Sequence, residues 1–247
     1  MSLFDQPPVF IVGAQRSGTT WLQRMLAELP EVISGQESHL FSGYLAPAWE
    51  RWQIERAQRD NGNRTVGLAC YLTEEELVEE LRGFAQRTFE RLIPSKPTAT
   101  RFVEKTPDHA LHLPLIHRLF PDATVIHVLR DGRDVVASLM DAAKQEWGSE
   151  WAPPTIHDAC DRWQKSVTSI QEHLPLFSHS MRVRYEDLIF EGPAKLKEVI
   201  HFLNLTCTEE QIEDIHQRWT FNDNLEQQQE SLIIRGECNS GREPQGF

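Results

Sequence analysis

The fold is decided by the stretch PVFIVGAQRSGTTWLQRML at residues 8–26. It begins with an apolar run, residues 8–12, which has the length and composition of a buried strand. Gly13 and Gly18 bracket a short polar loop. Apolar residues then recur at helical spacing, at Trp21, Leu22, Met25, Leu26 and Leu29. A strand, a glycine loop and a helix in this order form the first half of a βαβ unit.

The loop differs at one position from the nucleotide-binding pattern G-x-x-x-x-G-K-[ST]. The two glycines have the right spacing and Thr20 supplies the hydroxyl, but Thr19 occupies the lysine position and the nearest cation is Arg16, inside the loop. A glycine turn that opens a helix presents free backbone N–H groups to an anion, and an arginine fork suits phosphate or sulfate oxygens. We therefore predict an anion site. The alternative is an ordinary turn whose Ser and Thr side chains cap the helix.

Further strands and helices alternate along the chain. Apolar runs typical of strands occur at 100–104, 123–129 and 181–185, and segments of helical character at 109–119, 132–145 and 155–174. This alternation predicts a mostly parallel sheet with helices on both faces. The expected fold is a three-layer α/β domain that spans residues 1–247.

Residues 41–98 interrupt this alternation. Residues 46–67 are polar and predicted to be irregular, whereas residues 73–93 predict one amphipathic helix. Its apolar positions near one face are Leu77, Leu81, Phe84 and Leu92. Thr73 and Glu76 have the spacing of a capping box at its start. We expect a helical insertion over the carboxyl edge of the sheet, where open α/β folds bind ligands.

Charge and composition exclude several classes of partner. The net charge of −12 argues against general binding of nucleic acid or of anionic membranes, and no stretch is apolar enough for a membrane span. The N-terminus lacks the basic region of a secretory signal, so a cytoplasmic enzyme is expected. The four cysteines lie far apart, which favours reduced thiols. The sequence leaves the oligomeric state open.

Histidines at 109, 112 and 117, with His127 on a predicted strand, raise the question of a metal site. Their spacing matches no known zinc pattern, and no Asp or Cys completes a set. We interpret the first three as histidines at the polar edge of a helix and predict no metal.

A second cluster lies at residues 125–141, VIHVLRDGRDVVASLMD. Arg130 follows a predicted buried strand, and Ser138 lies eight residues later on the next helix. Side chains at the carboxyl end of such a strand face the ligand crevice, so this pair could bind a second phosphate. Asp131 and Arg133 could instead pair with each other or cap the helix.

Together the two clusters resemble the sulfotransferases that use PAPS, 3′-phosphoadenosine-5′-phosphosulfate. That family carries an RSGTTW-like or KSGTTW-like loop for the 5′-phosphosulfate, and an Arg with a downstream Ser for the 3′-phosphate. Here the loop is Arg16, Ser17, Gly18, Thr19, Thr20 and Trp21, and the pair is Arg130 with Ser138. EKTP at 104–107 and VRYEDL at 183–188, which includes Tyr185, resemble elements of the bacterial and Golgi branches. The resemblance runs from about Val9 to Leu205, and residues 41–98 match poorly.

The resemblance implies in-line transfer of a sulfuryl group from PAPS to a hydroxyl or amine acceptor, with PAP as product and no metal. Arg16 is then expected beside the phosphosulfate, with Thr19 and Thr20 stabilising charge that develops in the transition state. Lys105 would contact the transferring sulfonate or the acceptor. In relatives that act on glycans or proteins, a glutamate soon after the first helix is the base, and Glu37 matches it here. His39 remains the alternative base, because an imidazole titrates near neutral pH.

The sequence is compatible with more than one C-terminal loop, acceptor and reaction class. The family usually has an R-K-G-x-x-G-x-W-like loop near its end, which Arg235 and Gly236 match in part, so a truncated chain is one interpretation. The acceptor could be a small molecule, a glycan, a lipid or a peptide. Two other functions are considered: a P-loop kinase or NTPase with a divergent lysine position, and a non-catalytic nucleotide-binding relative.

Overall fold

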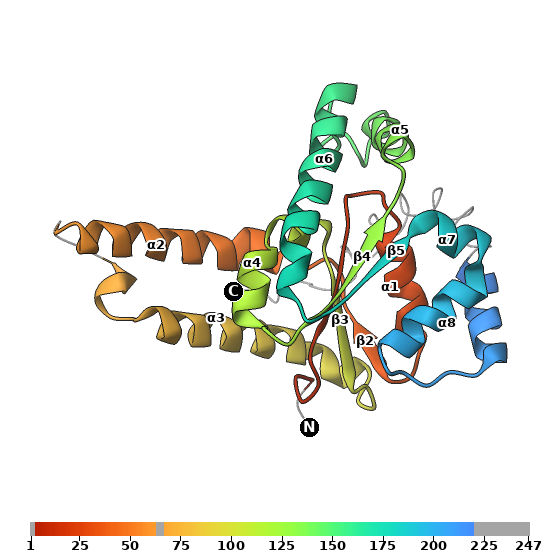
Figure 1. The fold of residues 1–247 in the computed structure, drawn as a ribbon, viewed down its shortest axis with the longest axis horizontal. Helices are drawn as coiled ribbons and strands as arrows, with labels where there is room; N and C mark the ends of the chain where they lie inside the picture. The colour runs from red at the N-terminus through yellow and green to blue at the C-terminus, as the bar shows by residue number, and fades with distance from the viewer. Residues whose placement is uncertain (1–2, 63–66, 220–247) are drawn as a thin grey trace, which may run out of the picture.

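The computed structural model describes residues 3–62 and 67–219. At its centre is a sheet of five parallel strands in the order β2-β3-β1-β4-β5 (Figure 1). The strands are β1 (Val9–Val12), β2 (Val32–Ser34), β3 (Arg101–Lys105), β4 (Thr124–Leu129) and β5 (His179–Arg184). The predicted parallel α/β sheet is confirmed. The short edge strand β2 was not predicted.

The helices follow the strands in alternation. They are α1 (Thr19–Ala27), α2 (Ala46–Asp60), α3 (Glu74–Phe89), α4 (Leu113–Leu119), α5 (Gly132–Ala143), α6 (Ile156–His173), α7 (Tyr185–Phe190) and α8 (Gly192–Phe202). The helices predicted at 132–145 and 155–174 are confirmed. The one predicted at 109–119 is divided into a 3-10 turn, Pro107–Leu111, and α4. Among the described residues, no helix combines the length and the apolar content that a membrane crossing requires.

Strand side chains alternate between two apolar clusters, which makes the fold three-layered. Phe10 and Val125 belong to the cluster that includes residues of α4 and α6. Ile11 and Ile126 face the opposite way, into the cluster with residues of α1 and α8. Figure 1 shows α1 and α8 on the same side of the sheet. With both faces covered, β1, β3 and β4 are buried along nearly their whole length, as parallel strands usually are, whereas the edge strand β5 has one buried residue, Val183.

The strand order places a topological switch at β1. From β1 the chain goes to β2 and β3 on one side of it, and then to β4 and β5 on the other. In open parallel sheets the ligand crevice lies beyond the carboxyl ends of the strands at such a point. The crevice is therefore expected directly after β1, at the glycine loop of residues 13–18.

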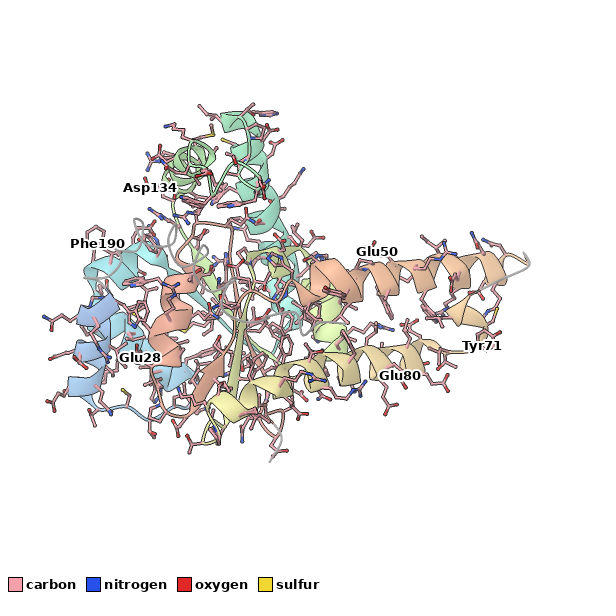
Figure 2. The ribbon with its side chains drawn as sticks, turned by 180° about the vertical axis from the view of Figure 1, so that it is seen from behind. Glu28, Glu50, Tyr71, Glu80, Asp134 and Phe190 are labelled. Atoms are coloured by element: carbon pink, nitrogen blue, oxygen red, sulfur yellow. The ribbon has the colours of Figure 1, made fainter. Side chains whose placement is uncertain are left out.

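Helices α2 and α3 form an arm that extends sideways from the sheet (Figure 1). In Figure 2, Glu50 and Glu80 mark its two helices and Tyr71 lies near its tip. The expectation that residues 46–67 are irregular is therefore wrong for α2, which spans 15 residues. The expectation that the insertion covers the carboxyl edge is wrong for the arm, which lies to the side.

Contacts across the arm explain why the polar segment 46–60 is helical. Trp49 stacks on Trp52 with ring centroids 5.7 Å apart, and Arg118 of α4 covers the Trp49 ring. Glu55 is buried and accepts hydrogen bonds from Arg51 and from the backbone N–H of Ala69. The contacts of Trp49 with Arg118 and of Glu55 with Ala69 join residues distant in sequence, so local periodicity did not reveal them.

The capping box predicted at the start of α3 is confirmed, but one of the apolar residues predicted on its buried face is exposed. Thr73 and Glu76 form the reciprocal capping box. Leu77 is buried, and Leu81 and Leu92 pack against the apolar clusters. Phe84 was expected on the same face but is 44% exposed. The buried face of α3 is therefore narrower than its sequence pattern suggests.

Candidate functional site

The glycine loop turns tightly between β1 and α1. A side chain at Gly13 would lie 2.5 Å from the carbonyl oxygen of Val128, so only glycine lets β1 end this close to β4. Gly18 has a φ of 87°, and a Cβ there would lie 2.3 Å from the ring of Tyr185. Both glycines are therefore required by the local geometry.

The first turn of α1 is left without a side-chain cap. The N-cap residue is Gly18, and no side chain in the described part of the chain accepts a hydrogen bond from the first backbone N–H groups of the helix. Ser17 and Thr19 are buried beside this turn. The alternative in which Ser and Thr side chains cap the helix is therefore wrong. Uncapped N–H groups at a helix N-terminus form a site for an anion.

Arg130 and Tyr185 border the loop on the β4–β5 side. The Arg130 guanidinium lies over the Tyr185 ring, 4.3 Å from its centroid, and donates a hydrogen bond to the carbonyl oxygen of Arg16 at 3.0 Å. Its Nε is buried and has no hydrogen-bond partner among the described residues. A buried guanidinium donor without an acceptor is costly, and an anion at this position would satisfy it.

The side chain of Arg16 lies with this group. Its Nε donates to Ser138 Oγ at 3.0 Å, and its guanidinium is 5.8 Å from the ring centroid of Trp147. The backbone of Arg16 is left-handed, with a φ of 68°. The structure thus brings Arg16, Arg130, Ser138 and Tyr185 together on one side of the loop. Trp21 packs beneath them, with its ring centroid 5.9 Å from that of Tyr185.

Lys105 connects the loop with the other side of the crevice. It is 2% exposed at the end of β3. Its ammonium donates to Thr20 Oγ1 at 2.9 Å and forms an ion pair with Glu37. A buried cation needs such partners, because water does not reach it. The predicted residues Thr20, Lys105 and Glu37 therefore form one connected group.

His39 lies next to this group and at the surface. Its Nε2 is 3.6 Å from a carboxylate oxygen of Glu37, and its Nδ1 is 3.4 Å from one of Asp108. The His39 side chain is 51% exposed, against 38% for Glu37. Glu37 contacts Lys105 and His39 does not, so the geometry places Glu37 nearer the loop.

Helix α1 helps to fix the segment that carries both candidate bases. Gln23, buried on α1, donates to Ser34 Oγ at 2.7 Å and to the carbonyl oxygen of Gly35 at 2.8 Å. Ser34 Oγ in turn donates to the carbonyl oxygen of Val103 on β3. The chain leaving β2 is thereby tied to the same helix whose N-terminus forms the anion site.

Two histidines are buried rather than at a polar edge. His109 and His127 are both inaccessible, and none of their ring nitrogens has a hydrogen-bond partner among the described residues. Burial lowers the pKa of His109 to about 3 and that of His127 to about 4. The interpretation of His109 as a polar-edge residue is therefore wrong. Within residues 3–62 and 67–219, no group of three or more His, Cys, Asp or Glu side chains could hold a metal ion.

Asp131 and Arg133 pair with each other and cap the helix, which is the alternative that their sequence positions allowed. Asp131 caps α5 by accepting from the backbone N–H of Arg133 at 2.9 Å, and the two side chains pair with each other. The hydrogen bonds from Arg133 lower the pKa of Asp131 to about 2. Arg133 therefore serves its own helix, whereas Arg130 faces the loop.

The sequence analysis missed a support behind the loop. Arg162 of α6 donates to the side chain of Gln15 at 2.9 Å and to the carbonyl oxygen of Trp151 at 2.8 Å. It joins the loop to the 147–151 segment that brings Trp147 onto Arg16. The Gln15–Arg162 pair spans 147 residues, so no local pattern could reveal it. Arg235, predicted to bind the cofactor, lies outside the described residues.

Comparisons with known proteins agree with this geometry. A sequence model described as Sulfotransferase family matches residues 7–210. Protein-tyrosine sulfotransferase 1 of Danio rerio is 26% identical over 204 residues, which cover 81% of this chain and 54% of that protein. The Homo sapiens protein of the same name is 26% identical over 168 residues, 67% of this chain and 42% of its own length. The chain spans about half the length of these curated relatives.

Solved structures show the same fold. The sulfotransferase domain from the curacin biosynthetic pathway superposes with a TM-score of 0.56 at 21% identity, covering 83% of this chain and 77% of that one. Mouse sulfotransferase SULT7A1, solved in complex with PAP, gives 0.52 at 14% identity, covering 87% of this chain and 64% of its own. The family match covers most of the sequence, including the glycine loop, Lys105, Arg130 and Ser138. The chain therefore belongs to the sulfotransferase family.

Proposed function

We propose that this chain transfers a sulfuryl group from PAPS to an acceptor hydroxyl, with Glu37 as the base. The observation that carries the proposal is the connection Thr20–Lys105–Glu37, in which one buried ammonium joins the anion-binding loop to a carboxylate. Such an arrangement sets a charge-neutralising group and a proton acceptor on the two sides of one reacting position.

The residues present fit PAPS at both of its charged ends. The uncapped N-terminus of α1 suits the phosphosulfate, and the unsatisfied Nε of Arg130 suits a second phosphate beside Ser138. The Arg16 side chain donates a hydrogen bond to Ser138, and its carbonyl oxygen accepts one from Arg130. Arg16 therefore links the phosphosulfate site with the site of the second phosphate. When bound, PAPS supplies the sulfuryl group and a bisphosphate leaving group.

Each residue of the acceptor side has a separate task in this proposal. Glu37 accepts the proton of the acceptor hydroxyl as that oxygen becomes the nucleophile. Lys105 holds the Glu37 carboxylate and offers its positive charge to the transferring group. Thr20 fixes the ammonium through its Oγ1 and belongs to the first turn of α1. His39 stands outside this chain of contacts.

A kinase or NTPase is not favoured. The position of the lysine that would reach the terminal phosphates is held by Thr19, which is 3% exposed. Lys105 is committed to Thr20 and Glu37. A non-catalytic nucleotide-binding relative would keep the Lys105–Glu37 pair only to neutralise the buried ammonium, so turnover separates the two functions.

The test is transfer of radiolabelled sulfuryl from PAPS to a panel of acceptors. Peptidyl tyrosine comes first because the curated relatives carry that name, and small phenols, glycans and lipid alcohols complete the panel. The proposal predicts turnover with at least one acceptor and its loss in Lys105→Ala. Binding of PAP without turnover on any acceptor would favour the non-catalytic alternative.

A further inference from the structure

The segment of residues 35–40 crosses the carboxyl end of β3, and two of its consecutive residues engage opposite faces of that strand. Glu37 pairs with Lys105, whose neighbour Val103 on the same face belongs to the α1-side cluster. Ser38 binds Glu104, on the face that Phe102 shares with α4 and α6. Successive side chains of a strand point to opposite faces, so Glu104 and Lys105 lie on opposite faces at the end of β3. Ser38 contacts Glu104, and Glu37 contacts Lys105.

Glu104 is a buried carboxyl group with two hydroxyl partners. It is 1% exposed, and its Oε1 accepts from Ser38 Oγ at 2.6 Å and from Thr106 Oγ1 at 2.9 Å. Thr106 Oγ1 also accepts from the backbone N–H of Ser38 at 3.1 Å. Ser38 Oγ accepts from the backbone N–H of Leu40 at 3.2 Å. These four bonds form a clamp, defined by Glu104, Thr106 and Ser38, that holds the backbone on both sides of His39.

Within residues 3–62 and 67–219, no opposite side-chain charge lies within hydrogen-bonding distance of Glu104. The nearest ring nitrogen, His109 Nε2, is 3.6 Å from Oε1, and burial keeps that imidazole neutral by lowering its pKa to about 3. The Lys105 ammonium points to the other face and is taken by Glu37 and Thr20. Burial raises the pKa of Glu104 itself. A group this costly to bury is retained here for the two hydroxyls that it orients.

The backbone held by the clamp is strained. His39 has a φ of 46°, in the left-handed region that residues with a side chain seldom adopt. Such a conformation persists only where the surroundings impose it, and the bonds at Ser38 and Leu40 flank it directly. The turn at His39 brings the backbone N–H of Leu40 back onto Ser38 Oγ.

We infer that Glu104 is a positioning residue for the candidate base: through Ser38 it fixes Glu37 on Lys105. The inference rests on the proposed function in one respect, that Glu37 is the base. Among the described residues, the side-chain hydrogen bonds of Glu104 go to Ser38 and Thr106, and its carboxyl group also interacts with the backbone N–H and the charge of its neighbour Lys105. The effect of Glu104 on Glu37 through Ser38 passes through the backbone of residues 37–39. An error of about 1 Å in the position of a catalytic group can lower a rate roughly 100-fold.

The first experiment compares Glu104→Ala, Glu104→Gln and Ser38→Ala by steady-state kinetics. Glu104→Ala and Ser38→Ala are expected to lower kcat about 100-fold while the KM for PAPS stays within about twofold. Glu104→Gln keeps an acceptor oxygen for both hydroxyls and is expected to recover most of the kcat. Ser38→Ala removes one hydroxyl from a half-buried position, so it tests the inference even if Glu104→Ala fails to fold.

Glu55→Ala is the matched control, because Glu55 is also a buried glutamate but lies on the arm, bonded to Arg51 and Ala69. It should lower the melting temperature without the loss of kcat. Equal losses of kcat in Glu104→Ala and Glu55→Ala, or full activity in Ser38→Ala, would overturn the inference.

Amide hydrogen exchange separates this inference from the proposed function. In Glu104→Ala the amides of Ser38 and Leu40 should exchange faster than in the wild type, and in Glu55→Ala they should not. Unchanged exchange in Glu104→Ala would overturn the clamp even if the wild type transfers sulfuryl groups. A wild type without turnover but with the predicted exchange would contradict the proposed function and leave the clamp supported.

Discussion

The two sides of the crevice, divided by β1, handle charge in opposite ways. On the β4–β5 side, Arg16 and Arg130 lie together, and the Nε of Arg130 has no acceptor among the described residues. On the β3–β2 side, Lys105 is neutralised by Glu37. The first side therefore suits a permanent anion, and the second suits a neutral hydroxyl that must lose a proton. The difference is the basis on which we propose the nucleotide for one side and the acceptor for the other.

The largest expected effect comes from removing the candidate base. Glu37→Gln keeps a hydrogen-bond acceptor for Lys105 but cannot take a proton, so kcat should fall by about 10²–10⁴-fold. Affinity for PAP, measured by calorimetry, should be unchanged because Glu37 lies on the acceptor side. Glu80→Gln, an exposed change on the arm (Figure 2), is the control. A larger loss in His39→Gln than in Glu37→Gln would transfer the role of base to His39.

On the opposite side, Arg130→Ala should weaken binding rather than turnover. Loss of a charged hydrogen-bonding group costs about 1.5–3 kcal/mol, so the Kd for PAP should rise roughly 10- to 100-fold. At saturating PAPS the kcat should change little. Arg133→Ala is the matched control, because Arg133 pairs with Asp131 at the surface. A fall in kcat with unchanged Kd would contradict the division between the two sides.

A smaller effect is expected at the loop that joins the two sides. Gly18→Ala places a Cβ against the Tyr185 ring at a φ of 87°. The left-handed backbone alone costs about 1–2 kcal/mol for a residue with a side chain, which thermal unfolding can measure. Gly43→Ala, where a Cβ would meet no heavy atom within 4 Å, is the control. Equal melting temperatures for the two variants would show that the loop geometry is wrong.

The last prediction is a pH dependence of stability that comes from two buried histidines. His109 and His127 have pKa values of about 3 and about 4 in the folded chain, against roughly 6.5 when unfolded. Both are neutral when folded, so their contribution is complete above pH ~6.5 and is lost as the pH falls, because the unfolded chain then binds protons. Each histidine should lower the free energy of unfolding by about 1.4 kcal/mol for every unit that the pH falls between pH ~6 and ~4.5. Denaturant unfolding of His127→Leu should show a shallower acid limb, and an unchanged limb would refute the assignment.

The sequence predicted the parts of this molecule that local patterns encode. The strand–loop–helix of residues 8–26, the strands that became β3, β4 and β5, and the approximate bounds of α5 and α6 all follow from periodicity and glycine placement. Strand β2 was not predicted because its three residues are too few to form a recognisable pattern. Helix α2 was not predicted because its stability depends on contacts such as that between Arg118 and Trp49, which lie 69 positions apart in the sequence.

The site was predictable to a similar extent. The resemblance indicated Arg16, Arg130 and Ser138, and the structure brings them into contact. Glu104 was passed over although it stands in the fully buried strand RFVEK, where a buried acid is unusual. Its partner Ser38 lies 66 residues away, so only the tertiary structure reveals what the carboxyl group does.

The central claim is that the crevice binds a nucleotide with two separate anionic ends, as PAPS has, rather than a nucleoside triphosphate. Calorimetric titration of the wild type with PAP and with ATP–Mg²⁺ tests it most directly. The account predicts that PAP binds more tightly, and that Arg130→Ala removes most of the difference. Tighter binding of ATP–Mg²⁺, or a preference for PAP that Arg130→Ala leaves intact, would contradict it.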